Sequence, residues 1–135
     1  MPDPVVEQGP FRTWNGREAF EIHEGVRLHA IGGEQVLLCK VRYEPGKQVP
    51  WHAHEDTEQV MVILDGEVEM TIEEETQVLK AGDLAVVNRG RQHKLFSPGG
   101  VTFMEALAPV PLDHVPDRSL DLVLGPDGGS RHVDR

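Results

Sequence analysis

The chain has 135 residues, of which 23 are acidic and 13 basic, and its formal net charge is −10 at pH 7. This length fits one domain with a single core, and so negative a surface argues against binding to nucleic acid or to anionic membranes. The single cysteine, Cys39, cannot form an internal disulfide, and a lone thiol suits a reducing compartment, so we expect a cytoplasmic protein.

The two ends of the chain differ in composition from its middle. Residues 1–19 are rich in Pro, Gly and charge, and we expect a loose arm or an added edge strand there. This stretch has no basic region followed by an apolar one, so we expect no secretory signal. The longest apolar run, residues 60–64, is far shorter than the roughly 20 residues of a membrane helix. Residues 111–135 predict a loop-rich tail, with one short helical turn around residues 118–122.

The middle of the chain, residues 20–110, predicts an all-β domain. An early strand alternates Val26 and Leu28 with Arg27 and His29. Asp65-Gly66 follows a β-branched run and is a strong hairpin signal. Further strands are predicted at residues 37–44, 60–64, 67–73, 77–80, 84–87, 94–96 and 101–108, with turn residues between most of them. Because several short strands at close spacing are typical of closed β-architectures, we predict a jelly-roll barrel.

Three histidines stand where one barrel could bring them together. His52 and His54 are two residues apart, so a strand would present both imidazoles on one side. Gln59 begins the next strand and can return a carbonyl oxygen to the same place, although Glu58 is the alternative ligand. His93 follows the turn at residues 88–90. Three imidazoles and one oxygen suit Zn, Fe, Mn, Ni or Cu.

These residues resemble the two sequence motifs of the cupin superfamily over residues 34–110. The first motif is matched by Gly46, His52, His54, Gln59 and Gly66, and the second by Gly82, Gly90 and His93. Asn88 and Ser97 depart from the second motif at a turn and a support residue. The resemblance implies a cupin double-stranded β-helix. It also implies one divalent transition metal (Zn, Ni, Mn or Fe) bound by His52, His54, Gln59 and His93, with Gln59 in place of the usual acid.

A neutral ligand set leaves the full charge on the metal and favours polarisation of a carbonyl. Glu105 lies in phase with Phe103 on the last predicted strand, and we expect it to be the catalytic acid or base. The alternative is a rim position in which Glu105 pairs with Arg27 or Arg91. As substrate-binding residues the sequence suggests Arg27, Trp51, Met61 and Phe103, although Arg27 could equally face solvent and Trp51 could belong to the core.

Fold alone does not fix the reaction. The ligand pattern is most similar to cupins that convert pectin- or alginate-derived uronates to keto forms, and next to cupin-type polyketide cyclases. This resemblance implies an enzyme that moves a proton next to a metal-polarised carbonyl. The alternatives are a quercetinase-like dioxygenase and a ligand-binding cupin without catalysis. Met104, Ala106 and Ala108 make the other face of their strand apolar as well, so we expect a homodimer that binds a small-molecule substrate.

Overall fold

The computed structural model of the chain describes residues 10–11, 13–15, 19–33, 35–109, 121–124 and 130–133. All regular secondary structure within these residues is β-strand, which confirms the all-β prediction. The strands are β1 (Phe20–His23), β2 (Val26–Gly32), β3 (Leu37–Tyr43), β4 (Lys47–His52), β5 (Glu58–Ile72), β6 (Glu75–Lys80), β7 (Leu84–Val87), β8 (His93–Ser97), β9 (Val101–Ala108), β10 (Asp121–Leu124) and β11 (Ser130–Val133).

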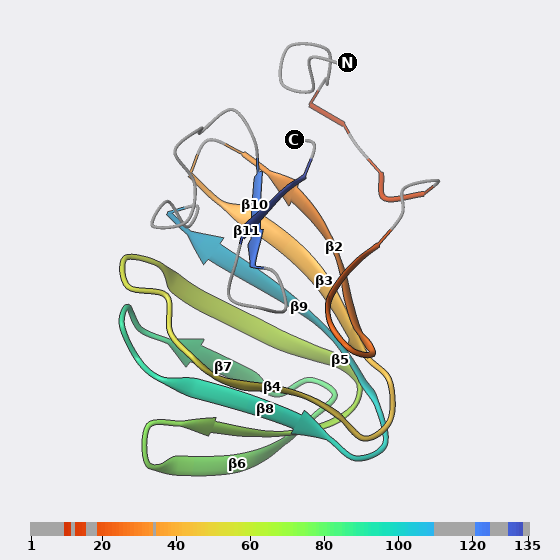
Figure 1. Cartoon of the computed structure of the whole chain (residues 1–135), viewed down its shortest axis with the longest axis vertical. Coiled ribbons are helices and arrows are strands. Elements are labelled where there is room, and N and C mark those ends of the chain that lie inside the picture. Colours follow the sequence, from red (N-terminus) through yellow and green to blue (C-terminus); the bar gives the residue numbers. More distant parts are fainter. Residues whose placement is uncertain are drawn as a thin grey trace.

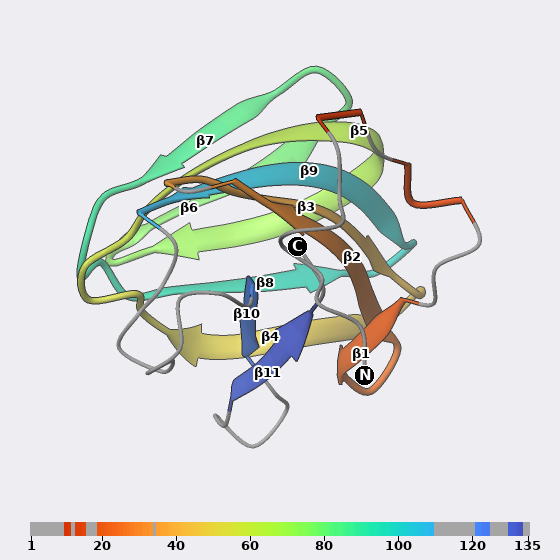
Figure 2. The same ribbon diagram turned by 90° about the horizontal axis from the view of Figure 1, so that it is seen from above.

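The strands form the two facing walls of a jelly-roll barrel (Figure 1). Hydrogen-bonded neighbours follow the order β1-β2-β3-β9-β5-β8-β4, and β6 and β7 each pair with β5. In Figure 2 the strands β3, β9, β5 and β7 lie on the upper side, while β4 and β8 form the lower side. The order is non-sequential, so strands distant in the chain lie side by side and can bring distant residues to one site.

The core fills the space between the two walls. On β3, buried and exposed residues alternate without interruption, as expected for a strand with one face inside and one in solvent. The buried apolar residues come from both walls and include Leu28, Val41, Ile63, Val68, Leu95 and Phe103. Burial of these side chains is the main favourable contribution to the stability of the barrel.

The predicted hairpin at Asp65-Gly66 is wrong, because both residues lie inside β5, a single strand of 15 residues. The first part of β5 pairs with β9 and β7, and the second part pairs with β6 and β8. A register shift between Ile63 and Asp65 marks the bend where the strand passes from one wall to the other. Gly66 has φ +81° there, a conformation that glycine adopts without steric penalty.

Gly66→Ala is predicted to be much more destabilising than Gly46→Ala. Both glycines have φ +81°, but a Cβ on Gly66 would overlap the carbonyl oxygen of Gly100, whereas a Cβ on Gly46 would meet nothing within 4 Å. We expect Gly46→Ala to cost about 1 to 2 kcal/mol and Gly66→Ala about 1 to 3 kcal/mol more. Denaturant unfolding of both variants measures the difference, and equal losses would contradict the close packing of Gly66 on Gly100.

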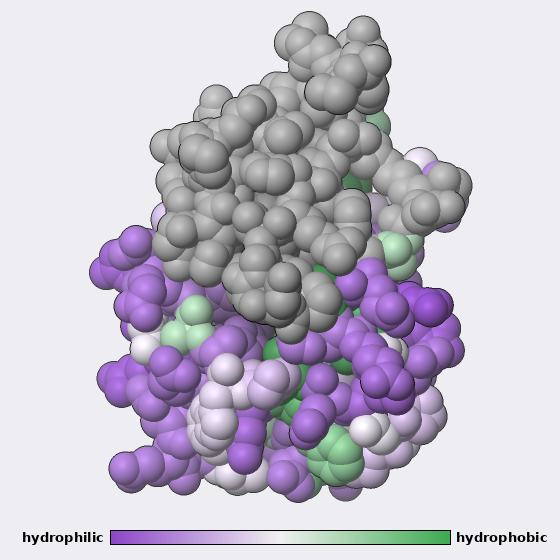
Figure 3. Space-filling view, viewed as in Figure 1, coloured by the Kyte–Doolittle hydropathy of each residue, from purple (hydrophilic) through white to green (hydrophobic). Residues whose placement is uncertain are grey.

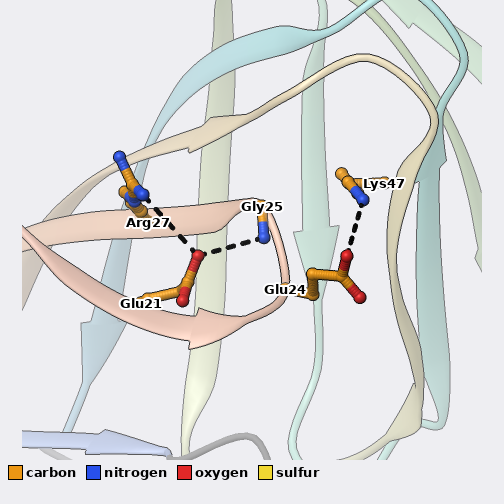
Figure 4. A network of polar contacts seen from close by, with 5 residues as sticks. All are labelled: Glu21, Glu24, Gly25, Arg27 and Lys47. Carbon is orange, nitrogen blue, oxygen red and sulfur yellow. Dashed lines mark hydrogen bonds and ion pairs between the residues drawn. The ribbon is translucent and has the colours of Figure 1, made fainter.

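The β1–β2 hairpin is fixed against the start of β4 by charged residues (Figure 4). Glu21 accepts a hydrogen bond from the backbone N–H of Gly25 at 3.3 Å and lies 3.8 Å from the guanidinium of Arg27. Lys47 on β4 pairs with Glu24 at 3.2 Å. Arg27 is therefore exposed on the outside of the barrel, paired with Glu21.

The predicted helical turn around residues 118–122 is wrong where it can be judged. Residues 118–120 lie outside the described part, but Asp121 and Leu122 belong to β10. This strand pairs antiparallel with β11, and β10 contacts β2. Among the described residues there is no helix of the length and hydrophobicity needed to cross a membrane.

Candidate metal centre

Three histidines from different segments meet between the walls. His52 ends β4, His93 begins β8, and the two are register partners with ring centroids 4.0 Å apart. His54 follows in the loop after β4, and its ring lies 5.5 Å from His52 and 5.7 Å from His93. One nitrogen of each ring lies within 4.8 Å of the others. Two nitrogens bound to one ion are at most about 4.2 Å apart, so small ring movements suffice to bind a metal.

Backbone carbonyls orient two of the imidazoles. The Nδ1–H of His52 donates to the carbonyl of Pro50 at 2.8 Å, and that of His93 donates to the carbonyl of Arg91 at 3.0 Å. Each ring then presents an unprotonated Nε2, the form that binds a metal. The Nε2 of His93 is buried and has no hydrogen-bond partner among the described residues. A buried acceptor without a partner is unfavourable, and a bound metal ion would satisfy it.

Two of the histidines, His52 and His93, are neutral at physiological pH. Burial, followed by the proximity of His93, lowers the pKa of His52 to about 4. Burial also lowers the pKa of His93 to about 4; the hydrogen bond to the Arg91 carbonyl opposes this shift, and the proximity of His54 adds a smaller lowering effect. Since metal ligands must be deprotonated, these rings can bind a cation without first losing a proton. The donor set therefore fits a divalent transition metal.

Gln59 and Glu58 occupy opposite sides of β5. Gln59 is buried with 3% of its surface exposed, whereas Glu58 is exposed. The Nε2 of Gln59 donates to Glu105 at 2.6 Å and to the sulfur of Met61 at 3.7 Å. The amide nitrogen is thus engaged, so Oε1 is the atom that Gln59 can offer to a metal. These positions favour Gln59 over Glu58 as the fourth ligand. That Gln59 binds a metal stays a prediction.

Glu105 lies on β9, with Met61 as its register partner on β5 and Cys39 as its partner on β3. The residue keeps some exposed surface, but its carboxyl group is desolvated, and this burial raises the pKa of Glu105 to about 7. Arg27 and Arg91, the alternative partners, pair instead with Glu21 and Glu73. Glu105 is therefore joined to the predicted ligand Gln59 rather than to an arginine.

The suggested substrate-binding residues divide into two groups. Met61 and Phe103 are inside the barrel with 1% and 2% of their surfaces exposed, next to Glu105 on the paired strands β5 and β9. Trp51 is 48% exposed, and the ammonium of Lys94 lies 4.9 Å from the centre of its ring. Trp51 and Arg27 thus contact solvent and surface charges, and the structure does not bring them to the three histidines.

The loop that carries His54 is held at both ends by hydrogen bonds that the sequence did not reveal. The N–H of Gly90 donates to the carbonyl of His54 at 2.8 Å, which joins the loop to the turn before His93. The hydroxyl of Thr57, buried with 2% of the residue exposed, donates to the carbonyl of Pro109 at 2.9 Å. No local pattern identifies Thr57, because its partner is 52 residues away.

Thr57→Val is expected to weaken metal binding about tenfold, because loss of an outer hydrogen bond loosens the ligands that it supports. The valine keeps the shape of the side chain but cannot donate to Pro109. Thr57→Ser keeps the donor and is the matched control, with metal affinity close to that of the unmodified protein. Competition with a chromophoric chelator measures both affinities. Equal affinities of the Val and Ser variants would remove Thr57 from the support of the site.

Gln59→Glu tests the contact between Gln59 and Glu105. Two carboxylates at this distance cannot both be ionised, so the single variant is expected to be destabilised. The double variant Gln59→Glu/Glu105→Gln exchanges donor and acceptor and should recover most of the loss. We expect a coupling free energy of about 1 to 3 kcal/mol from unfolding of the metal-free proteins. Additive losses would indicate that the two side chains do not interact.

Comparisons with known proteins identify the family. The cupin domain model matches residues 39–107. Quercetin 2,3-dioxygenase of Bacillus subtilis (strain 168) is 33% identical over 79 residues, which are 58% of this chain and 20% of that protein. The chain thus spans about a fifth of this curated relative.

Two solved structures have the same fold. An RmlC-like cupin from Shewanella frigidimarina NCIMB 400 has a TM-score of 0.72 and 22% identity, over 80% of this chain and 97% of that one. KdgF from Halomonas sp. has a TM-score of 0.72 and 18% identity, over 78% of this chain and 98% of that one. At these identities the likeness extends to the fold alone. The barrel, its three clustered histidines and the matched domain together make this chain a member of the cupin family.

Proposed function

We propose that this cupin is a metal-dependent enzyme that transfers a proton next to a carbonyl group. The observation that carries the proposal is the 2.6 Å hydrogen bond between Gln59 and Glu105. Gln59 is the predicted fourth ligand of the metal, beside the cluster of three histidines. This hydrogen bond links a carboxyl group that can move a proton to a predicted ligand. A metal ion and an acid–base group in one interior are the two elements that enolisation of a carbonyl requires.

The metal would be held by His52, His54, His93 and Gln59 as one divalent Zn, Ni, Mn or Fe ion, and it supplies positive charge that polarises the substrate carbonyl. Gln59 is uncharged, so the ligand set leaves that charge undiminished. The Nε2 of Gln59 donates to Oε2 of Glu105, which leaves Oε1 of Glu105 as the oxygen that can approach the substrate.

The proposed step breaks a C–H bond next to the carbonyl. The proton moves to Oε1 of Glu105, and the bonding electrons move onto the carbonyl oxygen to give an enolate. Where the substrate has a C=C bond conjugated with the enolate, Glu105 then returns the proton to the far carbon of that bond, which shifts the double bond and completes an isomerisation without any oxidant. Met61 and Phe103, both buried beside Glu105, provide apolar surface around the carboxyl group that moves the proton.

A second candidate is an oxygen-dependent dioxygenase. The similarity to quercetin 2,3-dioxygenase favours it, at 33% identity over 79 residues. The matched region is a fifth of that relative, so the similarity extends to one cupin domain and not to the whole enzyme. The same three histidines would serve in both reactions.

Two assays on protein reconstituted separately with Zn, Ni, Mn or Fe distinguish these functions. The first follows deuterium incorporation from heavy water into an unsaturated uronate obtained from pectin and into a cyclic β-diketone, by NMR. The second follows oxygen uptake with quercetin. Proton transfer predicts incorporation above the protein-free rate that is lost in Glu105→Gln, without oxygen uptake. Oxygen uptake without incorporation would favour the dioxygenase, and a protein with bound metal but neither activity would be a ligand-binding cupin.

A further inference from the structure

The hydroxyl group of Tyr43 has no protein partner among the described residues, although Tyr43 lies inside the barrel. Tyr43 ends β3 on the buried side of the strand, with 3% of its surface exposed. The surface drawn in Figure 3 is mainly hydrophilic in its coloured residues, and polar groups there can bond to water. Tyr43 belongs instead to the core cluster, and no described residue forms a hydrogen bond with its hydroxyl. Because buried polar groups are nearly always hydrogen-bonded, this donor is suited to an acceptor from outside the chain.

The immediate neighbours of Tyr43 are apolar side chains, which cannot accept a hydrogen bond. Its register partners are Val26 on β2 and Val101 on β9, and both are buried. Its ring packs against that of Phe103, with the ring centroids 5.8 Å apart. Unlike the Nε2 of His93, which is fully enclosed, the Tyr43 oxygen retains some accessible surface. A polar group of a ligand can therefore reach it.

Tyr43 and Glu105 lie on the inner side of the same wall. The strands β3 and β9 pair so that Tyr43 is opposite Val101 and Cys39 is opposite Glu105. The two side chains are therefore separated by four residues along the strands, or about 13 Å. Phe103, one of the suggested substrate-binding residues, lies between them. Burial raises the pKa of Tyr43, and the negative charge of Glu105 raises it further, as expected for two groups in one poorly solvated interior. A molecule that contacts Phe103 can thus reach the carboxyl group at one end and the phenol at the other.

We propose that Tyr43 determines substrate specificity by donating a hydrogen bond to an uncharged oxygen at the end of the substrate remote from its metal-bound carbonyl. The inference rests on the proposed function, because the metal and Glu105 define the reacting end of the substrate. A phenol that keeps its proton is a hydrogen-bond donor. A hydroxyl or carbonyl oxygen fits this position better than a carboxylate, since a second negative charge near Glu105 is unfavourable. The substrate class is therefore a carbonyl compound with at least one further uncharged oxygen.

The hydrogen bond from Tyr43 acts on binding rather than on the chemical step. It lies away from the carbon atom that loses its proton and does not change as the enolate forms. It therefore stabilises the bound substrate and the transition state to the same extent. Loss of such an interaction raises KM and leaves kcat nearly unchanged. Glu105→Gln, by contrast, is expected to lower kcat, so the two roles are separable.

Tyr43→Phe removes the oxygen and keeps the ring that packs on Phe103. For the metal-loaded protein, we expect the KM of deuterium exchange to rise about fivefold, at nearly unchanged kcat, with the unsaturated uronate or the cyclic β-diketone. The dissociation constants of both compounds, from titration calorimetry, should rise by the same factor. The stability of the metal-free protein should not fall, because the hydroxyl has no protein partner to lose.

Ser97→Ala is the matched control, because Ser97 is also buried but its hydroxyl donates to the carbonyl of Glu67 at 2.6 Å. It should lower the midpoint of denaturant unfolding and leave the dissociation constants unchanged. A loss of stability in Tyr43→Phe equal to that in Ser97→Ala would show that the Tyr43 hydroxyl is already bonded within the protein, and would overturn the inference. So would a Tyr43→Phe variant that binds both compounds as tightly as the unmodified chain.

Tyr43 is the only tyrosine of the chain, so protein labelled with ¹³C at tyrosine Cζ gives one NMR signal, from this phenol. In the metal-loaded protein the signal should move when either compound is added. It should not move with acetate, which can bind a metal but is too short to extend to Tyr43. Movement without deuterium exchange would support the contact with Tyr43 and refute only the proposed proton transfer. A signal that neither compound moves at millimolar concentration, or that acetate moves equally, overturns the inference.

Discussion

Replacing His93 with alanine is expected to abolish metal binding. His93 has no exposed surface, and its buried Nε2 has no partner among the described residues. Loss of an outer hydrogen bond around a metal typically reduces affinity about 10- to 100-fold, so loss of a ligand should reduce it by more than about 100-fold. Elemental analysis after dialysis against trace Zn or Ni should give about one metal per unmodified chain and almost none per variant.

His29→Ala is the control, because His29 is outside the cluster of three histidines. It should retain metal. Since alanine at position 93 also leaves a cavity that lowers stability, His93→Gln is measured in parallel as a larger polar replacement, and circular dichroism verifies folding. A folded His93→Ala variant that binds metal as tightly as the unmodified chain would show that His93 is not a ligand.

Glu105→Gln is expected to retain the metal and to lose at least about 100-fold in the rate of proton transfer, because glutamine cannot accept a proton. The substitution preserves the shape of the side chain, and the amide oxygen of glutamine can still accept a hydrogen bond from Gln59. Metal content and stability should therefore change little. The deuterium-incorporation assay measures the loss, with substrate varied so that the effect on kcat is separated from that on KM.

Met61→Leu is the matched control for this variant, because Met61 is the register partner of Glu105 but cannot transfer a proton. A similar loss of rate in both variants would indicate that shape around the site, rather than acid–base chemistry, limits the reaction. Full activity in Glu105→Gln would exclude Glu105 from proton transfer and leave the proposed function without its base.

Alternation of apolar and polar residues was sufficient to predict most strands. Residues 84–87 and 101–108 were predicted with the bounds that the structure has for β7 and β9, and the predicted strand 37–44 is one residue longer than β3. The clustering of His52, His54 and His93 also follows from the sequence, because the cupin motifs fix both the ligands and the strands that carry them. Where one face of a strand is buried and the other is in solvent, the local alternation is enough to predict which side chains point into the core.

The sequence was insufficient where the outcome depends on distant partners. Asp65-Gly66 is a hairpin signal by local chemistry, yet β5 continues because the segments on either side of it pair with different strands. The hydrogen bond from Thr57 to Pro109 has no local signature for the same reason. Likewise, the ion pair of Arg27 with Glu21 depends on the β1–β2 hairpin, of which the sequence predicted the strand around residues 26–29 but not β1.

The carbonyl groups that orient His52 and His93 belong to the main chain, at Pro50 and Arg91. No side-chain substitution removes a carbonyl, so the tautomers of these two rings should persist through extensive mutation of their surroundings. A protein engineer who wishes to redirect this centre to another metal or another reaction therefore has one natural point of adjustment. That point is the charge of residue 59, set together with residue 105.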